Sequence, residues 1–123
     1  MKFELDLGAR APIIRSYGNG EFLIGERRIT SAVVLNGDAW DTALLPSDPA
    51  ALDESHLDAL AALGPDLILL GTGIIQMFLP PALQARLWSK GIGCEVMTTA
   101  AACRSYNVLV AEGRSVAAAL YPV

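Results

Sequence analysis

Two short segments of this sequence carry groups that can do chemistry. The first is Gly71-Thr72-Gly73, which follows an apolar run and can turn backbone N–H groups outward to bind an anion. The second extends from Arg104 to Asn107, where polar side chains interrupt an apolar stretch and need partners if they face a core. The candidate binding residues are therefore Gly71, Thr72, Gly73, Arg104, Tyr106 and Asn107. The alternative is that both segments only support the fold.

Cys103 is a candidate reactive thiol. If Thr99 caps a helix, Cys103 lies near the positive end of the helix dipole, and Arg104 beside it lowers the thiol pKa further. Such a thiol would act as a nucleophile or a redox sensor. We favour the ordinary interpretation, a small buried side chain beside three alanines. A Cys–His dyad would require the helix that carries His56, the single histidine, to meet the helix that carries Cys103.

Other sequence patterns of known chemistry are missing. The glycines lack the GxGxxG spacing, and the lysine of a phosphate-binding loop is absent. One histidine and two separated cysteines make no metal-ligand set, so we expect neither a metal nor a cofactor. No Gly-x-Ser-x-Gly elbow occurs, and Asp38 and Asp41 flank Trp40 in a pattern that is common by chance. The sequence favours a protein that is not an enzyme without excluding one.

Charge is unevenly distributed along the chain. The net charge is −4, but residues 38–66 carry seven acids and no Lys or Arg, whereas the remaining residues carry six acids and nine Lys or Arg. No Lys or Arg lies between Arg28 and Arg86. This acidic segment is either an ordinary solvated surface or a docking surface for a basic protein partner. A negative protein without basic patches is not expected to bind nucleic acid.

The sequence predicts a soluble, cytoplasmic protein. The first ten residues contain acids and no apolar core of a signal peptide, and both cysteines are expected to be free thiols. Residues 67–85 are uncharged, but Gly-Thr-Gly, a glutamine and Pro80-Pro81 interrupt them, so we expect no membrane span. Contact with a membrane is expected only through a partner, and a homo-oligomer remains open.

The first third of the chain is predicted to be β-structure. Short strands are expected near residues 13–17, 21–24, 27–30 and 32–36. Gly18-Asn19-Gly20 and Gly25-Glu26 are typical of tight turns. We expect the β-rich part to end at Asn36-Gly37.

The remainder alternates between helices and strands. Asp53 is predicted to cap a helix that ends before Gly64-Pro65, and residues 67–70 form a buried strand. A second helix starts at Pro80-Pro81, a strand follows at 94–97, and Thr98 or Thr99 caps a third helix over about 100–112. The pattern of residues 115–121 leaves strand and helix open.

These elements predict one α/β domain over residues 1–123. The composition is 53% hydrophobic and 18% charged, which excludes a disordered chain. Alternating strands and helices imply parallel neighbours. The predicted fold class is a compact three-layer domain with a central mixed sheet, N-terminal β-hairpins and about three helices.

Five motifs in order resemble a known family. They are residues 16–22, Trp40, residues 69–73, residues 101–109 and residues 112–120. The chain resembles, from about residue 12 onward, the small domain-of-unknown-function family whose mitochondrial members are complex I (NADH dehydrogenase) assembly factor 3 proteins. Ser105 stands where the family pattern has Thr, and Leu35-Asn36-Gly37 departs from the usual Pro-containing stretch.

The resemblance implies a three-layer α/β fold around a mixed sheet and a role in assembly through protein contacts. It marks the two polar segments as family motifs without giving them a role. Our first hypothesis is therefore an uncharacterised, non-enzymatic binding or assembly-type protein with a protein partner. The second is a small-anion binder or enzyme that uses the Gly71-Thr72-Gly73 loop with Arg104, Tyr106 and Asn107.

Overall fold

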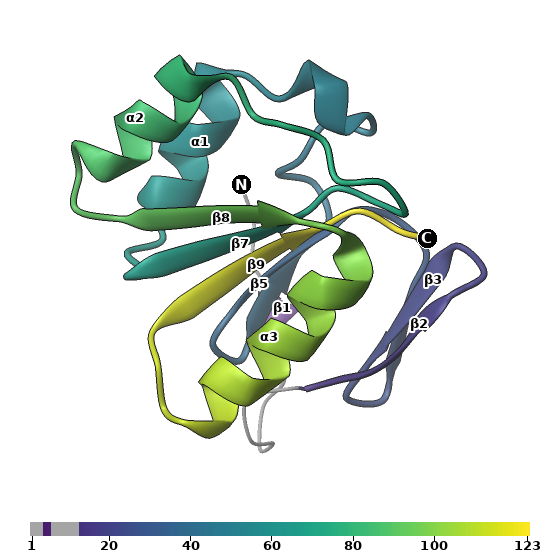
Figure 1. Cartoon of the computed structure of the whole chain (residues 1–123). Coiled ribbons are helices and arrows are strands. Elements are labelled where there is room, and N and C mark those ends of the chain that lie inside the picture. The colour runs from purple at the N-terminus through teal and green to yellow at the C-terminus, as the bar shows by residue number, and fades with distance from the viewer. Residues whose placement is uncertain (1–3, 6–12) are drawn as a thin grey trace.

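The computed structural model describes residues 4–5 and 13–123, which form three layers (Figure 1). A six-stranded mixed sheet is the middle layer. Helices α1 (Glu54–Ala61) and α2 (Pro81–Trp88) cover one face. Helix α3 (Thr99–Ala111) and a three-stranded sheet cover the other. The predicted α/β fold class is confirmed, while most of the segment examined for a signal peptide lies outside the described residues.

The carboxyl ends of the parallel strands lie at the same end of the central sheet. Its strands, in spatial order, are β1 (Glu4–Leu5), β6 (Ala39–Asp41), β5 (Val33–Asn36), β9 (Val116–Leu120), β7 (Leu67–Gly71) and β8 (Gly93–Met97). Strand β7 is parallel to both β8 and β9, while β5 is antiparallel to β9 and β6. Parallel neighbours require crossover connections, which α2 and α3 supply. The loop after β7 therefore leaves the sheet beside the start of α3.

The outer sheet is an antiparallel meander of β2 (Ile14–Gly18), β3 (Glu21–Ile24) and β4 (Arg27–Ile29). Asn19 and Gly20 both have positive φ values, 54° and 76°, as a two-residue hairpin turn requires. The predicted N-terminal hairpins and their turns are thus confirmed. Phe22, Ile24 and Ile29 point from this sheet into the core.

The prediction that the β-rich part ends at Asn36-Gly37 is wrong. Gly37, with φ of 63°, turns the chain back into β6, which pairs with β5 from Val34↔Asp41 to Asn36↔Ala39. An Asn-Gly pair signals a hairpin as well as an end, and only three residues of the second strand follow it. The returning strand was too short to show an alternating pattern.

Residues 116–120 form a strand, which settles the question left open by their alanine-rich sequence. All five are buried, and β9 pairs with β5 and β7 on its two sides. Alanine favours helices, but position between two strands overrides that preference. Its small side chains allow the layers on both faces to approach: Ala118 contributes to one core, and Ala117 and Ala119 to the other.

Candidate functional site

Gly71 is required by close packing. A Cβ atom at this position would lie 2.9 Å from Thr99 Cα, 3.0 Å from Ala102 Cβ and 3.1 Å from Leu120 Cδ2. The residue ends β7 where the first turn of α3 crosses it. Only the absence of a side chain lets the two elements approach this closely. Gly71 therefore serves the contact between sheet and helix.

The next two residues use their polar groups internally. The Thr72 N–H donates to Met97 O at 3.0 Å, and the Gly73 N–H donates to Thr99 Oγ1 at 2.9 Å. Thr99 Oγ1 in turn donates to Tyr121 O at 2.7 Å. Because these amides already have partners, they do not form a cradle for an anion. The second hypothesis therefore cannot draw on the amides of Thr72 and Gly73.

The other three candidates join α3 to its neighbours: Asn107 and Arg104 contact β2, and Tyr106 contacts the turn between β5 and β6. Asn107 binds both backbone groups of Ile14: its Oδ1 accepts from the N–H and its Nδ2 donates to the carbonyl oxygen, each at 2.8 Å. Tyr106 is fully buried, and its hydroxyl lies 3.4 Å from Gly37 O. Exposed Arg104 reaches Tyr17 Oη at 3.2 Å. These contacts tie the helix to its neighbours rather than surround the Gly71–Gly73 loop.

The surroundings of Cys103 agree with the interpretation of a small buried side chain rather than a reactive thiol. Thr98, not Thr99, caps α3, and its side chain accepts from the Ala101 N–H. The Cys103 side chain is buried with 1% exposed, and burial raises the pKa of its thiol to about 12 despite the opposing effect of Arg104. Helix α1, which carries His56, lies on the opposite face of the sheet (Figure 1). Cys103 therefore forms no dyad with His56.

Among the acids of residues 38–66, one is buried and two cap helices. Asp41 is buried, and its Oδ1 accepts from the Ala43 N–H at 2.6 Å. Asp48 caps the short 3-10 helix η1 (Pro49–Ala51). Asp53 caps α1 as predicted, and the pKa of its carboxyl is lowered chiefly by a hydrogen bond from Ser55.

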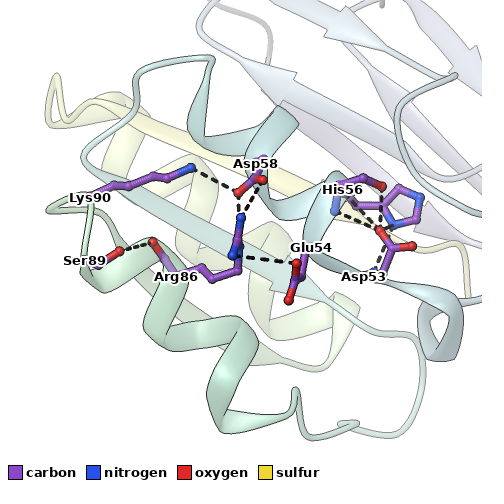
Figure 2. Close-up of polar contacts among 8 residues, drawn as sticks. Asp53, Glu54, His56, Asp58, Arg86, Ser89 and Lys90 are labelled. Carbon is purple, nitrogen blue, oxygen red and sulfur yellow. Dashed lines mark hydrogen bonds and ion pairs between the residues drawn. The ribbon is translucent and has the colours of Figure 1, made fainter.

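Asp58 is the acid most strongly held by bases. Arg86 Nη2 lies 2.8 Å from its Oδ2, and Lys90 Nζ lies 3.0 Å from its Oδ1, so α2 is joined to α1 (Figure 2). Hydrogen bonds from Arg86, and then from Lys90, lower the pKa of Asp58 to about 2. Arg86 also lies 3.7 Å from Glu54. Part of the acidic segment is thus neutralised by the helix that follows it.

The loop from β7 to α2 exposes large apolar side chains, which the sequence analysis did not single out. The exposed fractions of Ile74, Ile75 and Phe78 are 81%, 76% and 88%. A hydrogen bond network holds the loop: Thr72 Oγ1 accepts from the Met77 N–H at 2.9 Å and lies 3.1 Å from Ile75 O. The one feature of the sequence that could have indicated this loop is the uncharged run 67–85, in which turn residues interrupt apolar ones. We define Ile74–Phe78 as the apolar loop.

A pocket of about 230 Å³ lies beside the apolar loop. It opens between η1, the end of β7 and the residues that lead into α2. Its lining residues Leu52 and Leu70 belong to the core that α1 and α2 cover. Residues that line it include Ala50, Leu52, Leu70, Thr72, Met77 and Phe78. Of the six candidate binding residues, only Thr72 contributes to this lining. The pocket and the loop together are the candidate functional site.

Comparison with known proteins places this geometry in context. An uncharacterised protein of Rhodobacter capsulatus is 42% identical over 115 residues, which cover 89% of this chain and 84% of that protein. A crystal structure of a Bordetella parapertussis protein superposes with a TM-score of 0.86 at 33% identity and covers 94% of this chain and 99% of that one. Such agreement supports the three-layer fold.

A more distant relative carries a functional name. The NADH dehydrogenase [ubiquinone] 1 alpha subcomplex assembly factor 3 of Xenopus tropicalis is 30% identical over 116 residues, which cover 85% of this chain and 63% of that protein. In the part of the chain that the structure describes, no helix has the length and hydrophobicity to cross a membrane. Residues 14–121 match the family described as a protein of unknown function (DUF498/DUF598), and the chain therefore belongs to that family.

Proposed function

We propose that this chain is a non-enzymatic, assembly-type protein that binds a protein partner in the cytoplasm through the apolar loop. The observation that carries the proposal is the exposure of Ile74, Ile75 and Phe78 next to one another. Large apolar side chains gathered on one exposed segment are typical of interaction sites, whereas scattered ones need no explanation. The likeness to an assembly factor supports the same class of function.

The loop has the properties of a preformed contact. The hydroxyl of Thr72 bonds within it, and Gly73, with φ of 112°, adopts a conformation that side chains disfavour. A loop that is already ordered loses less conformational entropy when a partner binds. The hydrogen bonds therefore hold the apolar side chains in place before a partner binds, so that binding costs little further conformational entropy.

Capture of the partner tests this proposal. The tagged chain is expressed in its native cells, and the proteins it retains are quantified by mass spectrometry for the wild type, Ile75→Ser with Phe78→Ser, and Val108→Ser. Val108 is the matched control, because it is also exposed, at 57%, but lies on α3 across the sheet. We expect the double variant to retain at least about tenfold less of the specific partner, because removal of interface anchors weakens binding strongly. Its melting temperature should be unchanged. Equal retention by all three chains would contradict the proposal.

A further inference from the structure

The pocket beside the apolar loop has the size of one side chain. An apolar protein cavity of about 150 Å³ accepts benzene, and this pocket measures about 230 Å³. Sites for cofactors and drug-sized ligands usually start at about 300 Å³. The pocket is therefore large enough for an aromatic or leucine side chain and small for a cofactor.

The side chains that line the pocket are mostly apolar. Leu52, Leu70 and Met77 supply aliphatic and thioether surface. The single hydroxyl among the lining residues, Thr72 Oγ1, already bonds with the Met77 N–H and lies within hydrogen-bond distance of Ile75 O. The lining side chains therefore favour an apolar occupant.

Two exposed acids adjoin the pocket lining in the sequence. Asp48 precedes the lining residue Pro49, Asp53 follows the lining residue Leu52, and we call this pair the acidic rim. Neither carboxylate makes an ion pair with Lys or Arg within the described residues 13–123. Asp53 contacts His56 of its own helix, with Oδ1 3.1 Å from the ring Nδ1. The chain has no Lys or Arg between Arg28 and Arg86. The charge complementary to this rim is positive.

Two other occupants fit these observations less well. An anionic membrane is attracted by Lys and Arg around an apolar segment, and the rim carries acids instead. A second copy would bring the same acidic rim against itself about a two-fold axis.

We propose that the pocket binds one large apolar side chain, aromatic or leucine, from a partner segment that carries Lys or Arg beside it. This inference rests on the proposed function and names the chemistry of the partner. The anchor fills the pocket and contacts the apolar loop. The flanking bases lie against Asp48 and Asp53.

Selection from a phage-displayed library of random 12-residue peptides tests the inference without a known partner. The selecting proteins are the wild type, Ala50→Trp and Ala111→Trp. Ala50 is exposed at the pocket, so its replacement by Trp fills the pocket, whereas Ala111 is exposed at the end of α3 and is the matched control. We expect the wild type and Ala111→Trp to enrich peptides with an aromatic residue or Leu flanked by Lys or Arg, and Ala50→Trp to enrich none of them.

Fluorescence anisotropy with an enriched peptide then tests the rim. Asp48→Asn with Asp53→Asn removes both charges and keeps side chains that cap helices well. We expect affinity to fall at least about fivefold in this variant, and the affinity of the wild type to fall with rising salt.

Four results would each overturn the inference. They are enrichment of acidic peptides, enrichment unaffected by Ala50→Trp, binding that survives loss of both charges at low salt, and binding of phosphatidylglycerol vesicles in place of peptides. If cellular partner capture still depends on Ile75 and Phe78, only the inference fails; if capture does not depend on them, the proposed function fails as well.

Discussion

At the scale of single residues, the polar motif of α3 serves the fold. Asn107 satisfies both backbone groups of Ile14, a residue 93 positions away, and thereby joins α3 to the outer sheet. Arg104 makes one hydrogen bond, to the hydroxyl of Tyr17, and remains exposed. Neighbouring residues in one motif therefore contribute unequally to stability.

Substitution of Asn107 tests this difference. Asn107→Ala leaves a buried donor and acceptor without partners, so we expect it to lower the free energy of unfolding by about 1–3 kcal/mol. Arg104→Ala, the matched control, is expected to lower it by less than about 0.5 kcal/mol, as exposed side chains usually do. Urea denaturation measures both. A loss for Arg104→Ala as large as that for Asn107→Ala would contradict the assignment.

Cys103 is predicted to be unreactive in the folded protein. Burial raises the pKa of its thiol to about 12, and the thiolate is the reactive form. We expect iodoacetamide at pH 7 to 9 to leave Cys103 unlabelled until the chain is unfolded in urea, as peptide mapping by mass spectrometry would show. Rapid labelling of the folded chain at pH 7 would restore the nucleophile hypothesis.

At the scale of elements, the crossing of β7 and α3 depends on Gly71. Gly71→Ala would place a Cβ atom 2.9 Å from the backbone of Thr99, which a side-chain rotation cannot relieve. We expect a loss of about 1–3 kcal/mol in the free energy of unfolding, typical of overpacking. At Gly93 the nearest atom is the end of the Leu67 side chain, 3.2 Å away, so Gly93→Ala is the milder control. Equal losses in thermal or urea unfolding would contradict this account.

The contact between α1 and α2 gives a prediction for pH dependence. The pKa of Asp58 is about 2 in the folded chain and about 3.9 when unfolded, so its ion pairs stabilise the fold above pH 4 and are lost as pH falls toward 2. Asp58→Asn removes these pairs at every pH. We therefore expect the wild type to melt at a higher temperature than the variant at pH 6, and the difference to shrink between pH 4 and 2. A difference that stays constant across this range would refute the role of Asp58.

Local signals predicted the elements well. Asp53 caps α1 because an acidic side chain can bind the free amides of the helix it precedes, which depends only on adjacent residues. Strand β6 escaped prediction because its three residues are too few for a pattern. The conformation of residues 116–120 was left open because alanines favour a helix while the partners β5 and β7, distant in sequence, make a strand.

Signals at the candidate site were harder to interpret because they depend on tertiary structure. The sequence places Cys103 near a helix N-terminus, but its pKa is set by burial between layers. Apolar side chains such as Ile75 and Phe78 are expected in a core, and nothing in their sequence shows that they lie outside it. Only the folded chain separates the apolar residues that fill the core from those left exposed.

At the scale of the whole molecule, the two faces of the sheet have different roles. α3 and the outer sheet cover one face with motifs that are used internally. Helices α1 and α2 cover the other face (Figure 1), and the pocket opens between η1, the end of β7 and the residues that lead into α2. The central claim is that the chain meets a protein partner at the apolar loop beside this pocket.

Site-specific photo-crosslinking in native cells tests that claim most directly. A photoreactive benzoylphenylalanine replaces Phe78 in one chain and Val108 in another, and adducts are identified after irradiation by gel shift and mass spectrometry. Both positions are exposed, at 88% and 57%. We predict a discrete protein adduct from position 78 that is absent from position 108. Lipid adducts alone, no adduct, or the same adduct from both positions would contradict the account.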